Sequence, residues 1–136
     1  MRDDAWLLSR LSNIWDSYFS DIPQVNPVTI SFGRRAKYRF GSVRLAQFGR
    51  LFARKQCSII TISALFKKQT MPEAVVDYTI AHELAHYAHG FSSPHQRKMR
   101  HPHKGGVVDK ELIVRGLGPL VTAYKKWLRE YKEKAR

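Results

Sequence analysis

The first twenty residues place apolar side chains at the spacing of a helix. Between residues 3 and 20, five large apolar or aromatic residues recur on one side. Asp3 or Asp4 can cap the first turn, because a carboxylate accepts hydrogen bonds from the free backbone N–H groups there. Pro23 and Pro27 then end the pattern. We expect an amphipathic helix that packs on a core through Leu7, Leu11, Ile14, Trp15 and Tyr18.

Three apolar segments that follow have the length and composition of strands. Residues 28–32 are short and β-branched, and residues 38–45 alternate apolar and polar positions, with Gly41 at a predicted bulge. Residues 57–62 are almost all apolar or β-branched, which predicts a strand buried on both faces. Residues 48–55 fit either a loop or a short strand.

The second half of the chain has helical periodicity around one irregular stretch. A helix is expected over residues 72–89, with Pro72 at its start and Gly90 at its end. Residues 91–106 have no period and predict a loop. A short helix over residues 107–115 follows. A last helix is expected to begin at Pro119, with Leu120, Tyr124, Trp127 and Tyr131 on one face. Its polar tail is expected to fray from residue 130.

Length and charge narrow the class of protein. The 136 residues suit one domain, residues 1–136, and a hydrophobic content of 43% is typical of a globular chain. The formal net charge of +13 favours polyanions such as DNA as partners. The single cysteine, Cys57, excludes an internal disulfide, and no leader or membrane-length apolar segment is visible. We expect a cytoplasmic monomer that does not contact membranes.

The chemically informative segment is His82-Glu83-Leu84-Ala85-His86, in the middle of the expected helix over residues 72–89. Helical residues four apart project to the same side with Cβ atoms about 6 Å apart, which suits two imidazole ligands on one Zn²⁺. Glu83 then lies beside the metal, where it can take a proton from a zinc-activated water. This pattern predicts a zinc metallopeptidase with Glu83 as general base. The alternative is a pair of solvated helix histidines.

A catalytic zinc needs a third protein ligand, and two residues are candidates. His103 can be brought back over the helix by the irregular loop, and it is the favoured one. Glu111, in the helix that follows, is the alternative. His89 is either a neighbour of the ligands or an exposed helix end. Tyr78, one turn before the motif, is placed to support a ligand or contact substrate.

A second cluster lies between the first two expected strands. Four basic residues surround Tyr38 there, and phosphate contacts together with an aromatic ring for base stacking are typical of nucleic-acid binding. Ordinary solvated loop charges would have the same composition. The candidate nucleic-acid-binding residues are Arg34, Arg35, Lys37 and Arg39.

The order of these features resembles the SprT-like metallopeptidases, which include bacterial SprT and the Spartan-type proteases of DNA–protein crosslink repair. The resemblance covers residues 6–118 and depends on the segment MPEAVVDYTIAHELAH, followed by a basic loop and HPHKGG before another helix. It implies a compact α+β, zincin-like domain with a three-stranded sheet over the active-site helix. It also implies Zn²⁺ bound by His82, His86 and His103, and a protein or peptide substrate held by a strand edge within residues 57–62.

Two departures from that family keep other readings open. Val107 and Val108 replace its usual aromatic residue, and the spacing from His86 to His103 is slightly long. Both leave room for the related minigluzincin-type scaffold, which would use Glu111. The runner-up enzyme is a metal-dependent ribonuclease of the YbeY type, although Ser92 stands at its third histidine position. The non-enzymatic alternative is a nucleic-acid-binding module with a structural zinc.

Overall fold

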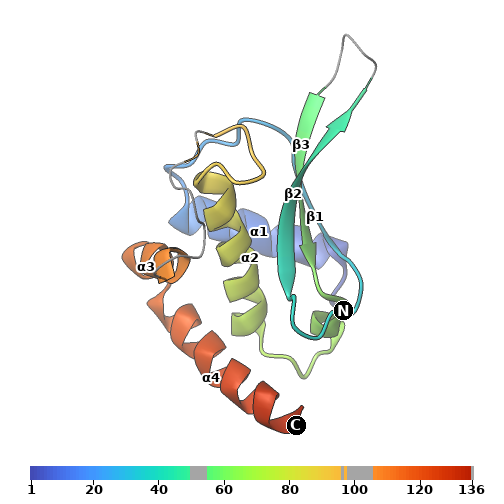
Figure 1. Cartoon of the computed structure of the whole chain (residues 1–136), viewed down its shortest axis with the longest axis vertical. Helices are drawn as coiled ribbons and strands as arrows, with labels where there is room; N and C mark the ends of the chain where they lie inside the picture. Colours follow the sequence, from blue (N-terminus) through green and yellow to red (C-terminus); the bar gives the residue numbers. More distant parts are fainter. Residues whose placement is uncertain (50–54, 96, 98–105, 136) are drawn as a thin grey trace.

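The computed structural model describes residues 1–49, 55–95, 97 and 106–135. Over these residues the chain is an α+β protein with four α-helices and a three-stranded mixed sheet (Figure 1). The strands are β1 (Val28–Phe32), β2 (Gly41–Phe48) and β3 (Lys55–Ile62). They lie in the order β1-β3-β2, with β1 parallel and β2 antiparallel to β3. The central strand is therefore β3, and β1 and β2 form the two edges.

This order corrects two expectations about residues 57–62. The segment pairs with a neighbour on each side, so it has no free edge to hold a substrate. It is also buried on one face only: Ser58, Ile60 and Ile62 are buried, whereas Cys57 and Ile59 are half-buried. The residues on one face of β3 are buried because the helices pack against one face of the sheet (Figure 1).

Strand β2 is displaced from its predicted position by three residues. Gly41 begins the strand rather than interrupting it at a bulge. The preceding residues form a loop because Tyr38 and Phe40 contact rings of the last helix, with centroids 6.2 and 5.8 Å from that of Tyr131. At the other end, β2 and β3 extend beyond the helices (Figure 1), and Phe48 is exposed. Of residues 48–55, which fit either a loop or a strand in the sequence, Phe48 is the last residue of β2 and Lys55 is the first of β3.

The first two helices agree with the sequence pattern. Helix α1 (Asp4–Tyr18) is capped by Asp3, whose carboxylate accepts a hydrogen bond from the backbone N–H of Trp6 at 2.8 Å. Helix α2 (Glu73–Ala88) follows Pro72 and ends before Gly90, which has the positive φ of 84° that suits glycine after a helix. A short 3₁₀ helix η1 (Ala64–Lys67), which the pattern did not predict, leads into α2.

The last two helices pack beside α2. Helix α3 (Val107–Val114) ends close to Gly116, as predicted, and α4 (Gly118–Lys134) follows. The expected fraying from residue 130 is wrong, since α4 stays helical to residue 134. Tyr131 stabilises this end: its ring stacks on Trp127 and its hydroxyl donates a hydrogen bond to the Lys37 carbonyl at 2.8 Å.

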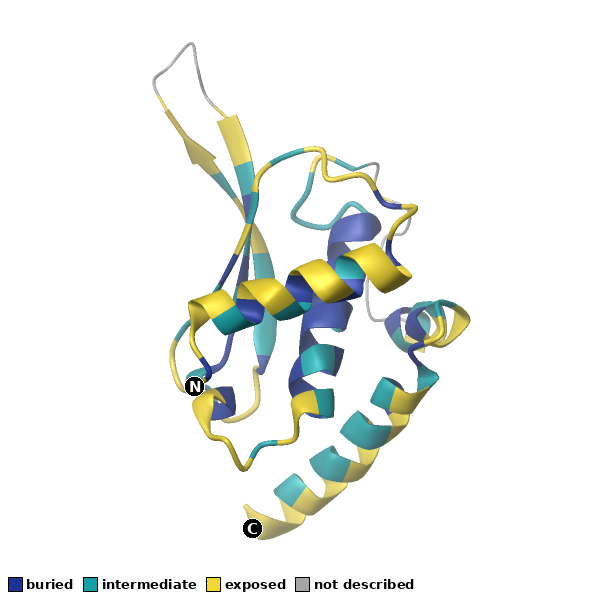
Figure 2. Cartoon of the chain, turned by 180° about the vertical axis from the view of Figure 1, so that it is seen from behind, coloured by how far each residue is buried: buried dark blue, intermediate teal, exposed yellow. Residues whose placement is uncertain are grey.

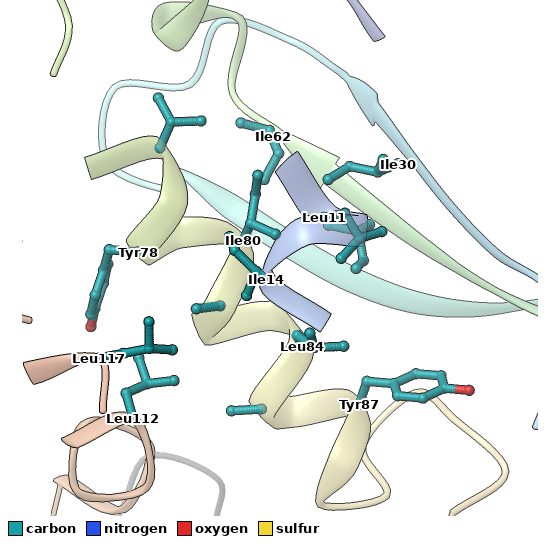
Figure 3. Packing of buried hydrophobic residues seen from close by; sticks show 14 of the residues in the cluster. Leu11, Ile14, Ile30, Ile62, Tyr78, Ile80, Leu84, Tyr87, Leu112 and Leu117 are labelled. Carbon is teal, nitrogen blue, oxygen red and sulfur yellow. The ribbon is translucent and has the colours of Figure 1, made fainter. Parts of the chain in front are cut away.

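Helix α2 lies at the centre of the core. Both α1 and α4 keep an exposed outer face, whereas α2 is buried along most of its length (Figure 2). It contacts α1, the sheet, α3 and α4, so all the described elements share one hydrophobic core. Side chains that meet there include Leu11, Ile30, Ile62, Ile80, Leu84 and Leu112 (Figure 3). Any chemistry on α2 is therefore held by the best-packed element.

Crossing a bilayer requires a long apolar helix, and none is found in the described part of the chain.

Candidate metal centre

The two histidines of the motif meet on one side of α2, where His86 is buried and His82 is half-buried. Their Nε2 atoms are 3.1 Å apart, and a ligand atom of Glu83 lies within 4.8 Å of both. Two nitrogens bound tetrahedrally to Zn²⁺ at the usual bond length would be separated by about 3.3 Å. The pair His82 and His86 therefore fits one such ion with little adjustment. Within the described ranges, no other group of three His, Cys, Asp or Glu side chains comes this close.

Glu83 is unusual for a carboxylate because it is only 5% exposed. Its Oε2 atom is buried and has no hydrogen-bond partner among the described residues. Burial raises the pKa of Glu83 to about 7, while the positive charge of Arg39 opposes part of that rise. A carboxylate with such a pKa can both accept and return a proton near neutral pH.

A cleft of about 420 Å³ opens over these side chains, a size within the usual range of ligand sites. Helix α2 forms one wall, and the start of β2 forms the other. The residues that line it are Tyr38, Arg39, Phe40, Gly41, Ser42, Val43, Tyr78, Thr79, His82, Glu83, His86, Phe91, Ser92 and Tyr124. The cleft thus combines the candidate ligands, the buried carboxylate and an edge strand.

Gly41 sets the distance between the two walls. A Cβ atom at this position would lie 2.7 Å from Cγ2 of Thr79 and 3.3 Å from Cγ of Glu83. Both are closer than ordinary van der Waals contact, so only glycine allows β2 to approach α2 this far. The sequence pattern indicates a bulge at this glycine, and its close approach to Thr79 and Glu83 was not predicted.

The two candidates for the third ligand differ in what can be described. His103 and His101 lie outside the described residues. Glu111 lies on α3, outside the group of three, and its Oε1 atom is 3.6 Å from Nε2 of His89 and 3.2 Å from a guanidinium nitrogen of Arg115. His89 is buried, at 3% exposure, so it is not an exposed helix end. Among the described residues, the carboxylate of Glu111 therefore contacts His89 and Arg115 rather than the histidine pair.

Tyr78 lines the cleft one turn before His82, with ring centroids 5.8 Å apart. Its ring stacks on Tyr124 of α4 at 4.0 Å, and its hydroxyl donates a hydrogen bond to Asp109 of α3 at 2.7 Å. Burial, together with this bond, raises the pKa of the Tyr78 hydroxyl, so it stays protonated. The ring, rather than the hydroxyl, is what Tyr78 offers to the cleft.

The basic cluster lies in the loop between β1 and β2. Arg34, Arg35, Lys37 and Arg39 are all exposed, and Tyr38 between them is 64% exposed. Arg39 and Tyr38 also line the cleft. The structure thus brings one end of this cluster to the candidate metal centre.

Neither a protein-family model, nor a curated protein, nor a solved structure matches this chain. The geometry of the cleft is therefore the basis for any functional assignment.

Proposed function

We propose that this chain is a zinc-dependent metalloendopeptidase of the SprT-like, zincin type. In this proposal His82 and His86 bind Zn²⁺, and Glu83 is the general base. The observation that carries it is the buried Oε2 atom of Glu83, which has no partner among the described residues and lies beside two imidazole nitrogens spaced for one metal ion. A solvated pair of helix histidines would not need a buried carboxylate between them.

The roles of the protein groups follow from this arrangement. When bound, Zn²⁺ supplies Lewis-acid polarisation of a peptide carbonyl and makes water more acidic. Glu83 accepts a proton from the water that attacks the carbonyl carbon. As the new C–O bond forms and the C–N bond breaks, Glu83 returns that proton to the leaving amine.

The substrate backbone is held by the free edge of β2. Among the described strands β2 pairs with β3 alone, and residues 41–43 line the cleft. An extended peptide can add to such an edge through main-chain hydrogen bonds, with little dependence on sequence. Strand β2 therefore takes the role that the sequence had predicted for residues 57–62.

For the third ligand we retain His103, with Glu111 as the alternative. The contact of Glu111 with Arg115 supports this order, because a carboxylate bound to a guanidinium must give up that contact to ligate a metal.

A cytoplasmic monomer remains part of this proposal, and the proposed substrates are DNA-associated proteins. The exposed basic loop of Arg34, Arg35, Lys37 and Arg39, which ends in the cleft, supports the choice of substrates.

The alternatives explain the cleft less well. A structural zinc site is closed by four ligands, and the described residues bring together only the three ligand atoms of His82, Glu83 and His86. A ribonuclease of the YbeY type would bind metal through histidines alone, and Glu83 would have no role.

One experiment separates these classes. Bound zinc and cleavage of a denatured protein are measured for the wild type, Glu83→Gln, His103→Ala and Glu111→Ala, with and without single-stranded DNA. We expect Glu83→Gln to retain zinc and lose at least about a hundredfold in activity. The zinc content of the other two variants identifies the third ligand. If Glu83→Gln cleaves as fast as the wild type, Glu83 is not the general base. If the wild type binds zinc but cleaves nothing, the peptidase proposal is wrong and the metal is structural.

A further inference from the structure

One end of the cleft is walled by aromatic rings from three different elements. Tyr38 and Phe40 come from the loop before β2, Tyr78 from α2 and Tyr124 from α4. The rings of Tyr78 and Tyr124 stack at 4.0 Å, and the ring of Phe40 lies 6.4 Å from that of Tyr124 at a steep angle. At the opposite end, near Ser92, Phe91 is the one Phe, Tyr or Trp among the described lining residues. The cleft therefore has two chemically different ends.

The wall of rings offers apolar surface rather than hydrogen-bonding groups. The Tyr78 hydroxyl is bound to Asp109, so its ring is the part that lines the cleft. Phe40 has no polar atom, and it is fixed by Trp127 at 5.3 Å and by Phe66 at 5.5 Å. Rings held in this way present apolar surface against which another aromatic or a large aliphatic side chain can pack.

The direction of a bound peptide decides which of its residues reaches this end. Strand β2 begins at Gly41, which lies against Thr79 and Glu83, and it runs away from the aromatic end. Antiparallel pairing is slightly more stable per residue than parallel pairing, so a substrate strand should run against β2. Its carboxyl-side residues then lie toward the aromatic end.

We infer that the aromatic end is a specificity pocket for a large apolar side chain, preferably aromatic, on the carboxyl side of the cleaved peptide bond. The inference rests on the proposed peptidase function and adds the substrate class. Arg39 lies at the same end of the cleft, and its positive charge disfavours Lys or Arg in the pocket. Substrates with Phe, Tyr or Leu at this position are therefore cleaved fastest, and those with Lys or Arg slowest.

The test uses a set of peptides that differ only in the residue after the cleaved bond, with kcat/KM measured for each by mass spectrometry. For the wild type with zinc we expect Phe to exceed Ala by roughly tenfold to a hundredfold, the range that a hydrophobic pocket can provide. Tyr124→Leu removes one wall and is expected to lower this ratio at least about threefold.

Two further variants protect the test against misfolding and indirect effects. Tyr38→Ala alters an exposed residue of the same wall, and its fold is expected to be intact. It should lower the Phe to Ala ratio in the same direction. Tyr18→Ala is the matched control, because Tyr18 is 39% exposed on α1 and does not line the cleft. Its ratio should equal that of the wild type, and circular dichroism checks all three folds.

The outcomes distinguish this inference from the proposed function. If the wild type cleaves no peptide in the set and no denatured protein, the peptidase proposal fails and this inference fails with it. If the wild type cleaves peptides without preference for apolar residues, or if neither Tyr124→Leu nor Tyr38→Ala changes the preference, the pocket is refuted while the peptidase stands.

Discussion

The approach of β2 to α2 can be tested with two substitutions that exchange a single methyl group between the walls of the cleft. Gly41→Ala adds a Cβ atom 2.7 Å from Cγ2 of Thr79, closer than carbon atoms can pack. Thr79→Ser removes that same Cγ2 atom but keeps the hydroxyl, which donates to the Val75 carbonyl at 2.8 Å. The two changes should therefore compensate each other.

The magnitudes follow from the contacts. Overpacking of this kind typically costs 1–3 kcal/mol, so about 2 kcal/mol is expected here. Replacing glycine also restricts the unfolded chain and returns about 0.5 kcal/mol, which leaves a net loss of about 1.5 kcal/mol for Gly41→Ala. Thr79 is 5% exposed, and deleting its methyl group should cost about 1 kcal/mol. Without coupling, the double variant would lose about 2.5 kcal/mol.

In the double variant, the new methyl group occupies the space that the old one left. We expect the free energy of unfolding of the double variant to lie within about 0.5 kcal/mol of the wild-type value, which gives a coupling free energy of about 2 kcal/mol. Urea unfolding followed by circular dichroism measures all four proteins. Peptidase activity should be reduced in Gly41→Ala and stay reduced in the double variant, because the added Cβ atom is 3.3 Å from Cγ of Glu83 in both. Additive losses near 2.5 kcal/mol would show that β2 does not approach α2 as described.

Two further predictions concern elements that hold the cleft. Arg2 is 6% exposed and donates hydrogen bonds to the backbone carbonyls of Phe66, Lys68 and Met71. Arg2→Met should therefore lower the free energy of unfolding by about 3 kcal/mol in urea titrations. Arg10→Met, which breaks more exposed ion pairs, should cost about 1 kcal/mol, and equal losses would contradict this reasoning. Trp127→Leu removes the ring that fixes Phe40, so it should lower the free energy of unfolding by about 2 kcal/mol and also reduce kcat/KM. Unchanged kinetics would show that the contact between Trp127 and Phe40 does not shape the cleft.

Local patterns predicted the parts of the fold that depend on local spacing. The bounds of α1, β1 and α2 agree with the sequence to within two residues, because apolar periodicity, the Asp3 cap and Gly90 act within each element. The proximity of His82 and His86 was predictable for the same reason, since residues four apart on a helix are neighbours whatever surrounds them.

The errors arose where distant segments decide the outcome. The start of β2 depends on rings of α4 that contact Tyr38 and Phe40 across the molecule. The burial of residues 57–62 depends on which face of the sheet the helices cover. The structured end of α4 depends on the contact of Tyr131 with Lys37. None of these contacts has a signature in the local sequence.

The burial of Glu83 unites the fold with the proposed chemistry. A motif places this carboxylate next to two histidines, but water around it would keep its pKa near the ordinary value. Because residue 41 is glycine, the backbone of β2 can approach closely enough to exclude that water. The same approach places the free edge of β2 beside the histidine pair, where a peptide would bind. An unpartnered buried carboxylate destabilises a protein. Such a cost is expected where the group takes part in the chemistry of the site, as the proposed general base would.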